Sequence, residues 1–237
     1  EEETLRSVTH FMGRTHWDKA IVELYNPTAK YYYCSEALRP EFIQETRTWQ
    51  PHNRKKIRLI TTGCSTFWKG LDTIIRTAKL LKERNIDFEW VLAGSIGNKE
   101  LLEWKENVKM TNVNIRSIGM LSAAELIEEL LNSDLYIHTA YIDNSPNSIC
   151  EAQILGMPII STNVGGIASL ITNGEDGILV PANDPFMFAN QIMTLSNNIS
   201  IQKTFSVKGI EKARSRHSIQ YIFQSLINIY HKIIPND

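Results

Sequence analysis

Two carboxylates stand out in the stretch DNSPNSICEAQILGMPIISTNVGG, residues 143–166. Asp143 opens the stretch, and seven residues separate it from Glu151. If a helix begins between them, the side chain of Glu151 leans back toward the helix start, because side chains on an α-helix tilt toward its N-terminus. Both carboxylates then lie near one place, where they could accept hydrogen bonds from the hydroxyls of a sugar.

The residues between the two carboxylates predict a helix start that binds an anion. Ser145 can serve as N-cap and Pro146 as the first helical residue, the arrangement that helix starts prefer. The amide hydrogens of Asn147 and Ser148 have no partner inside such a helix, and the helix dipole favours negative charge there. A diphosphate would accept both hydrogen bonds.

A purely structural interpretation of the two carboxylates is that Asp143 caps the helix and Glu151 faces solvent. Glu151 lies between Cys150 and Ala152 and is followed by Ile154, so this helix is expected to be largely buried. A buried carboxylate without a partner is costly. We therefore expect Glu151 to have a partner, from the protein or from a ligand.

A second stretch, TTGCSTFWKG at residues 61–70, follows a predicted strand and could bind phosphate. Gly63 permits a tight turn, and Lys69 lies at the start of the next predicted helix, where a cation is a natural phosphate ligand. The stretch matches neither GxxxxGK[ST] nor GxGxxG, the loops of nucleoside triphosphatases and of dinucleotide-binding enzymes. A solvated lysine is the simpler interpretation of Lys69 taken alone.

From Ile57 onward, short apolar runs rich in Val and Ile alternate with helical patterns. The predicted strands are 57–63, 88–94, 113–119, 134–140, 158–162 and 177–180. The helices predicted after them are 69–84, 98–107, 122–132, 146–155, 167–171 and 184–196. This alternation predicts an α/β fold with a doubly wound, Rossmann-like parallel sheet and helices on both faces. Ligands of such sheets bind beyond the C-terminal ends of the strands, where both polar stretches fall.

The chain is expected to divide into four segments. These are 1–44, with a short helix at 17–24 and a strand at 31–34; a polar linker, 45–56; the α/β domain, 57–215; and a C-terminal helix, 216–237. Two helices are predicted at 199–213 and 217–233. The second has one apolar face, which is expected to dock on this domain or on a partner domain rather than on a membrane surface.

The composition limits the functions to consider. The net charge is −1, which gives no reason to expect a nucleic-acid partner. Cys34, Cys64 and Cys150 lack metal-ligand spacing and are expected to be reduced thiols in a cytoplasmic protein. His138 falls in a predicted strand and is expected to be a packed residue. No signal peptide and no membrane span are expected, and because the chain opens EEETLRSV without Met, we expect a piece of a longer protein.

These motifs together resemble glycosyltransferase family 4, the retaining enzymes of the GT-B fold. Residues 143–166 resemble the family's donor-binding signature, and TTGCSTFWKG resembles its phosphate-binding loop. VLAGS and IRSIGMLSAAEL match further parts of the same C-terminal domain. GRTHWDKAIVELYNPTAKYYYCSEALRPEF resembles the end of the N-terminal domain in bacterial surface-polysaccharide transferases, so residues 1–44 are expected to be its last part.

The resemblance implies roles for individual residues. Lys69 would bind the diphosphate, Glu151 would hold the ribose hydroxyls and Asp143 would contact the transferred sugar, so Asp143 and Glu151 are the candidate catalytic residues. Ile118 and Met120 would line the base pocket. The full set implied for nucleotide-sugar binding is Gly63, Ser65, Lys69, Ile118, Met120, Asn144, Ser145, Asn147, Ser148 and Glu151. No cofactor or metal is expected, because the family does not generally need one.

Three positions depart from the family pattern. Asp143 replaces the usual first Glu and is one methylene shorter. Cys64 replaces the usual Arg five residues before Lys69, which removes a positive charge from the diphosphate site. Ala168 or Ser169 stands where a Glu usually follows the two glycines, so the hydrogen bonds of that Glu must be replaced.

The resemblance implies sugar transfer from a UDP- or GDP-sugar to a glycan or lipid-linked acceptor in a cytoplasmic enzyme, with peripheral membrane contact as a further expectation. The acceptor-binding N-terminal domain is expected to be a missing partner of this chain. Three alternatives stay open: a nucleotide-sugar-binding module without turnover, another GT-B enzyme such as a sugar-nucleotide epimerase, and a nicotinamide-dependent oxidoreductase. The last is disfavoured because no GxGxxG follows a strand.

Overall fold

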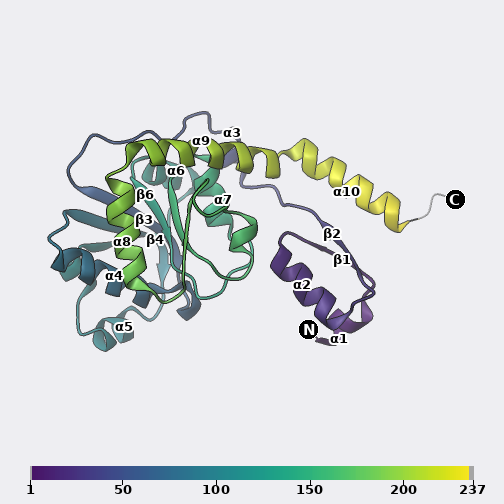
Figure 1. Cartoon of the computed structure of the whole chain (residues 1–237), viewed down its shortest axis with the longest axis horizontal. Helices are drawn as coiled ribbons and strands as arrows, with labels where there is room; N and C mark the ends of the chain where they lie inside the picture. The colour runs from purple at the N-terminus through teal and green to yellow at the C-terminus, as the bar shows by residue number, and fades with distance from the viewer. Residues whose placement is uncertain (1, 235–237) are drawn as a thin grey trace.

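The main body of the protein is a six-stranded parallel sheet with helices on both faces (Figure 1). The computed structural model describes residues 2–234. The strands are β3 (Ile57–Cys64), β4 (Phe88–Ile96), β5 (Ile115–Gly119), β6 (Leu135–His138), β7 (Ile159–Thr162) and β8 (Ile178–Val180). This architecture confirms the predicted α/β fold class.

The sheet is buried on both sides because two hydrophobic cores cover it. All four residues of β6 and all four of β7 are buried, as expected for central parallel strands. One core is built on α4 (Leu71–Glu83) and α8 (Pro185–Ser196). The other is built mainly on α6 (Ala123–Leu131) and α7 (Asn147–Ile154). The remaining elements of this body are the helices α5 (Lys99–Lys105) and α9 (Ile199–Arg216), and the 3-10 turns Phe67–Lys69, Met110–Val113 and Ile167–Ser169.

The strand order β5-β4-β3-β6-β7-β8 sets where a ligand can bind. The chain adds strands to one side of β3 and then crosses back to place β6 on its other side. At such a switch point the loops that follow the two strands diverge and leave a crevice at their C-terminal ends. The loop after β3 carries Lys69, and the loop after β6 carries Asp143.

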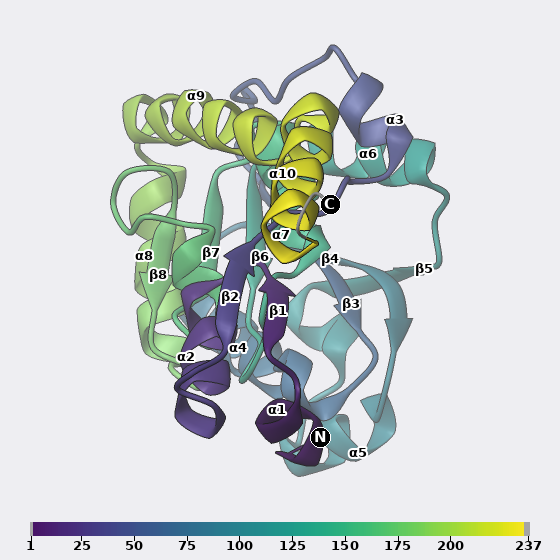
Figure 2. The ribbon, with the colours of Figure 1, turned by 90° about the vertical axis from the view of Figure 1, so that its right-hand side faces the viewer.

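Residues 2–33 form a small unit of their own. It contains α1 (Glu2–Ser7), β1 (His10–Gly13), α2 (His16–Tyr25) and β2 (Lys30–Tyr33), with β1 and β2 paired in parallel (Figure 2). The predicted helix and the predicted strand of this region correspond to α2 and β2. The sequence analysis did not predict α1 or β1.

The predicted linker 45–56 is irregular, as expected, but it is anchored to the domain. It follows the short helix α3 (Pro40–Gln44), which was also not predicted. Trp49 in this segment is buried, its indole N–H donates to the carbonyl of Ser133 at 2.7 Å, and its amide donates to Leu155 at 2.7 Å. The segment is therefore a packed strap across one end of the sheet.

The last helix, α10 (Ile219–Ile233), continues from α9 and extends beyond the sheet (Figure 1). Among its described residues only Ile229 is buried, whereas Ile219, Phe223 and Tyr230 are exposed. The apolar face was predicted to dock on the α/β domain or on a partner domain; the α/β domain leaves most of it uncovered, and docking on a partner domain stays a prediction. None of the helices in residues 2–234 has the length and apolar character needed to cross a membrane.

Candidate functional site

A cleft of about 420 Å³ opens at the switch point of the sheet. Its walls come from the C-terminal ends of β3 and β4, from the loops after β3 and β5, and from the start of α7, together with Leu126 and Arg39. Seven of the predicted binding residues line it: Gly63, Ser65, Lys69, Met120, Asn147, Ser148 and Glu151. The structure thus brings the two polar stretches of the sequence into one cleft.

Lys69 and Asp143 join the two sides of the switch point. Lys69 Nζ donates to Asp143 Oδ2 at 2.6 Å, and both side chains are mostly buried. The buried His138 ring lies behind them, with Nε2 3.3 Å from the same carboxylate oxygen. His138 is packed, as predicted, and it faces the carboxylate that the sequence analysis selected.

These neighbours fix the charge state of Asp143. Burial by itself would raise the pKa of Asp143, but His138 and Lys69 stabilise the carboxylate and hold its pKa at about 2. Burial lowers the pKa of His138, so the imidazole is neutral near pH 7. Asp143 is therefore an ionised hydrogen-bond acceptor and cannot act as a proton donor near neutral pH.

Glu151 has a protein partner that the sequence analysis did not identify. Its carboxylate is only 5% exposed and accepts two hydrogen bonds from Arg39, at 2.7 and 2.9 Å. The guanidinium of Arg39 also lies over the ring of Phe42, 4.7 Å from its centroid. The need for a partner was predicted from the burial of Glu151, but nothing in the local sequence pointed to a residue 112 positions away.

The first turn of α7 begins one residue later than predicted. Pro146 has an extended ψ of 119° and occupies the N-cap position, so Asn147 is the first helical residue and Ser145 is not the cap. The carbonyl of Pro146 accepts from Ile149 and Cys150, which leaves the amides of Asn147 and Ser148 at the open end of the helix. These two residues line the cleft, and anion binding by their amides stays a prediction after the shift of one residue.

The two glycines of the motif hold the loop that carries Asp143. Gly165 adopts φ +51°, and its neighbour Gly166 donates its amide hydrogen to the carbonyl of Asp143 at 3.0 Å. A Cβ atom at Gly165 would overlap the carbonyl oxygen of Asp143, and one at Gly166 would overlap that of Asn144. Only glycine allows the two backbones to approach this closely.

Three of the predicted binding residues lie elsewhere. Asn144, Ser145 and Ile118 are not among the described residues that line the cleft. Asp143, the predicted contact of the transferred sugar, is not among them either and reaches the cleft only through Lys69. Ser145 is buried, and Ile118 packs partly buried against the α6–α7 core. Asn144 turns toward the small N-terminal unit, where its amide donates to Asp18 at 3.0 Å and its carbonyl accepts from Thr15.

The positions that depart from the family pattern have identifiable environments. Cys64 is buried, and burial raises the pKa of its thiol to about 12, so it is neutral and gives the cleft no charge. Arg39 provides a second cation beside Lys69 in the cleft. Ser169 accepts a hydrogen bond from the amide of His16 at 3.0 Å, so this position contacts the N-terminal unit.

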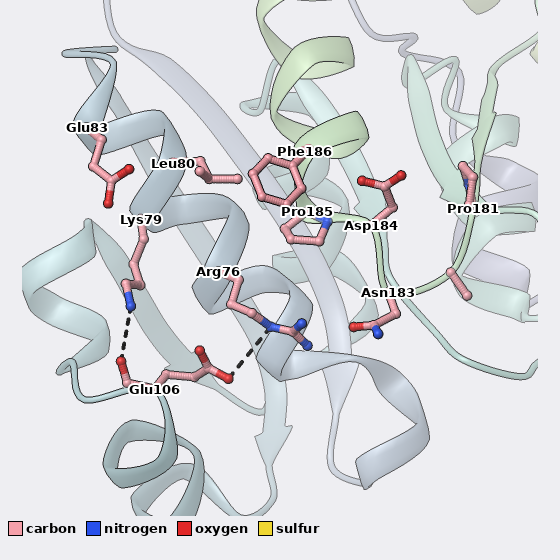
Figure 3. Close-up of a pocket in the computed structure, with 11 residues that line it drawn as sticks. Arg76, Lys79, Leu80, Glu83, Glu106, Pro181, Asn183, Asp184, Pro185 and Phe186 are labelled. Atoms are coloured by element: carbon pink, nitrogen blue, oxygen red, sulfur yellow. Dashed lines mark hydrogen bonds and ion pairs between the residues drawn. The ribbon is translucent and has the colours of Figure 1, made fainter.

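A larger hollow of about 630 Å³ lies away from these residues, between α4 and the start of α8 (Figure 3). None of the predicted binding residues is among the described residues that line it. Arg76 Nε lies 3.6 Å from Glu106, and Lys79 donates to the backbone carbonyl of Glu106 at 3.2 Å. Because neither of the two polar stretches singled out in the sequence lines this hollow, we place the candidate site in the smaller cleft. In residues 2–234 there is no group of three His, Cys, Asp or Glu side chains arranged to hold a metal ion.

Comparisons with known proteins identify the family of this chain. The family described as "Glycosyl transferases group 1" matches residues 42–212. The capsular polysaccharide biosynthesis glycosyltransferase CapM of Staphylococcus aureus is 25% identical over 167 residues, 70% of this chain and 43% of that protein. The 2-deoxystreptamine N-acetyl-D-glucosaminyltransferase of Niallia circulans is 27% identical over 164 residues, 68% of this chain and 42% of that protein. The chain thus spans less than half the length of these relatives.

Solved structures share the fold at low sequence identity. A glycosyltransferase from Rickettsia africae ESF-5 has a TM-score of 0.80 at 18% identity, covering 100% of this chain and 67% of that chain. Anabaena Alr3699/HepE in complex with UDP and glucose has a TM-score of 0.73 at 17% identity, covering 95% of this chain and 63% of that chain. At this level of identity the likeness is one of fold.

Proposed function

The chain belongs to the group 1 glycosyl transferases, and we propose that it is the donor-binding part of a retaining enzyme that uses a nucleotide diphosphate sugar. The acceptor is a glycan or a lipid-linked glycan, in a pathway of bacterial surface-polysaccharide synthesis. The similarity to CapM supports this class of product. We further propose that transfer needs the other domain of a GT-B fold, since this chain spans 43% of CapM.

One observation carries the proposal: Lys69, Glu151 and the open amides of α7 line the same cleft at the switch point of the sheet. Lys69 and the amides of Asn147 and Ser148 form a cationic end that suits a diphosphate. Their favourable interaction grows as the glycosidic bond breaks, because negative charge develops on the departing diphosphate.

The carboxylates suit the sugar parts of the donor. Arg39 orients Glu151, and a carboxylate with two oxygens has lone pairs left for ribose hydroxyls after accepting two hydrogen bonds. Asp143, ionised and beside Lys69, accepts from a hydroxyl of the transferred sugar. In this arrangement a diphosphate shares Lys69 with Asp143, so donor binding redistributes an ion pair that the free protein already contains.

Calorimetry with UDP, GDP and uridine tests the donor site. We expect Lys69→Ala to weaken UDP by about tenfold or more while leaving uridine unchanged, because only UDP carries the diphosphate. We expect Glu151→Gln to weaken UDP and uridine alike, by roughly 1–3 kcal/mol, because both carry the ribose. Lys208→Ala, at an exposed lysine outside the cleft, is the matched control for charge.

Two results would contradict the donor site. One is a loss of affinity in Lys69→Ala that is equal for UDP and uridine, which would deny a phosphate contact. The other is unchanged affinity for both ligands in Glu151→Gln. Release of UDP from a UDP-sugar by the whole protein, measured against binding alone, separates a transferase from a binding module without turnover.

A further inference from the structure

An aromatic hollow lies on the other side of the short turn that carries Lys69. It has a volume of about 410 Å³ and lies between the 3-10 turn Phe67–Lys69 and α5. Phe67, Trp68 and Trp104 line it and are all more than half exposed, and Trp104 reaches 79%. Single exposed aromatic side chains occur on ordinary protein surfaces. Several exposed aromatic side chains gathered in a concave site are instead typical of a binding surface.

A polar network of side chains lies between the aromatic hollow and the hollow of Figure 3. Asp72 Oδ2 accepts from Tyr141 at 2.8 Å and from Arg76 at 2.6 Å, and the Tyr141 hydroxyl oxygen lies 3.3 Å from Asn183 Oδ1. Asp72 and Tyr141 line the aromatic hollow, whereas Arg76 and Asn183 line the other. We call the two hollows together the α4 groove.

The α4 groove is long and has apolar side chains at both ends. Asp72 and Glu83 lie in its two hollows, and at about 1.5 Å per helical residue they are about 16 Å apart along α4. At the far end Phe186, 71% exposed, lies beside Leu80 (Figure 3). Hydrogen-bonding side chains fill the space between the aromatic ends.

The charges of the α4 groove are nearly balanced. Its cations are Arg76, Lys79 and Lys105, and its anions are Asp72, Glu83, Glu106 and Asp184. Three positive charges against four negative ones give no attraction for an anionic bilayer or for a polyanion. A neutral ligand that combines apolar faces with many hydroxyls fits better.

We propose that the α4 groove binds a carbohydrate chain, the glycan part of the acceptor. A sugar ring presents apolar C–H faces, which pack on aromatic rings such as those of Trp104 and Phe186. Its hydroxyls lie at the ring edge, where they can exchange hydrogen bonds with Asp72 and Arg76. Successive rings along a chain would then contact the aromatic ends in turn. Identifying the bound carbohydrate as the acceptor depends on the proposed transferase function. Binding of a carbohydrate in the groove does not depend on it.

The α4 groove and the donor cleft share one loop, the loop after β3. Trp68 accepts from the amide of Tyr141 at 2.7 Å, and Thr139 Oγ1 donates to the carbonyl of Lys69 at 2.9 Å. Lys69 lines the cleft and Trp68 the groove, one residue apart in the same turn. A glycan in the groove would therefore end next to the bound donor.

Binding of four neutral hexasaccharides tests the proposal: maltohexaose, cellohexaose, chitohexaose and mannohexaose. The protein is labelled with 5-fluorotryptophan and observed by ¹⁹F NMR, so that exposed Trp104 and buried Trp90 report separately. We expect at least one hexasaccharide to shift the signals of Trp68 and Trp104 and not that of Trp90. Trp104→Ala and Phe186→Ala should each weaken binding about tenfold, the effect of removing one well-packed aromatic contact.

Phe223→Ala is the matched control, since Phe223 is 63% exposed on α10 and lies outside the groove. It should leave hexasaccharide affinity unchanged. The proposal is wrong if none of the four hexasaccharides binds while UDP binds, an outcome that spares the donor site. Co-sedimentation of the protein with phosphatidylglycerol vesicles tests whether the groove contacts a membrane instead. The proposal is also wrong if the protein sediments with these vesicles, Trp104→Ala abolishes that sedimentation and no hexasaccharide binds.

Discussion

Arg39 and the buried Glu151 form an ion pair whose loss should lower stability. Removing Arg39 would leave a carboxylate that is 5% exposed without its two hydrogen bonds. We expect Arg39→Ala to lower the free energy of unfolding by about 1–3 kcal/mol, reduced from the range for fully buried pairs because Arg39 is partly exposed. Urea unfolding measures this change.

Arg47→Ala is the control for that pair. Arg47 also makes two hydrogen bonds to one carboxylate, that of Glu45, but at an exposed site. We expect Arg47→Ala to lower the free energy of unfolding less than Arg39→Ala does, because solvent-exposed ion pairs contribute little to stability. Equal losses in the two variants would show that the burial of Glu151 adds nothing to the pair.

Asp143 should make stability depend on acid pH. Its pKa is about 2 in the folded protein, below the ordinary 3.8, so the unfolded chain takes up a proton first as the pH falls. The stabilisation is full above the unfolded pKa and is lost as pH drops toward the folded pKa. It amounts to about 2 kcal/mol in total, of which about 1 kcal/mol should be lost between about pH 6 and pH 3.

Asp143→Asn removes this titration. Urea unfolding from pH 6 down to pH 3 should therefore show a shallower loss of stability in Asp143→Asn than in the original protein, whatever the absolute stability of the variant. Parallel pH profiles for the two proteins would mean that the carboxylate gains nothing from Lys69 and His138.

For single residues, the sequence predicted which side chains need a hydrogen-bonding partner better than it predicted which residue that partner is. A carboxylate in an apolar helix needs a partner, and this reasoning held for Glu151. Neither Arg39 nor His138 could be assigned to its carboxylate from the sequence, because each pairing depends on how distant segments meet. Asn144 shows the opposite error: its place in the motif suggested a ligand contact, but the side chain holds Thr15 and Asp18.

Among the elements, the loop after β6 depends on a glycine for its position. Gly165→Ala would place a Cβ against the carbonyl of Asp143 at φ +51°, so it adds steric overlap to backbone strain. We expect a loss of about 3 kcal/mol or more in the free energy of unfolding, and weaker UDP binding because the Asp143 loop must move. Thermal unfolding and calorimetry measure the two effects.

Gly174→Ala separates the effect of backbone strain from that of steric overlap. Gly174 also has a positive φ, +80°, but nothing lies within 4 Å of a Cβ added there. It should cost only about 1–2 kcal/mol, the strain of a left-handed L-residue, and should leave UDP binding unchanged. If both variants lost the same stability, close approach to the Asp143 loop would not be the reason for Gly165.

Element prediction succeeded where the apolar pattern was long and regular. Buried parallel strands read as runs of Val and Ile, and the helices between them have apolar faces, so all six strands of the main sheet were expected. The elements not predicted are α1, β1 and α3, which have six, four and five residues and lie outside the regular strand–helix alternation. The start of α7 was misplaced because Pro suits both the N-cap and the first helical turn in sequence, and only its ψ decides.

At the scale of the whole molecule, the sequence gives segments but not how they meet. The strap 45–56 looked like a free linker because its composition is polar, yet one buried residue, Trp49, fixes it to the domain. The apolar face of α10 is clear in the sequence, but its periodicity does not say which surface covers it. Such contacts join residues far apart in the chain, and local patterns do not record them.

The small N-terminal unit should be held to the main body by a few polar contacts. Asn144 binds Thr15 and Asp18, and Ser169 binds the amide of His16. All of these contacts involve residues at the start of α2, so their removal should free this unit without disturbing either core of the sheet.

We expect Asn144→Ala to speed tryptic cleavage within residues 2–34 several-fold, since cleavage follows local opening and one or two hydrogen bonds contribute about 1–2 kcal/mol. The thermal midpoint of the main body should change little. Ser169→Ala should act in the same direction, and the double variant should be cleaved faster than either single one. If Asn144→Ala left tryptic cleavage unchanged but weakened UDP binding, Asn144 would belong to the donor site after all, and its contacts with the N-terminal unit would be incidental.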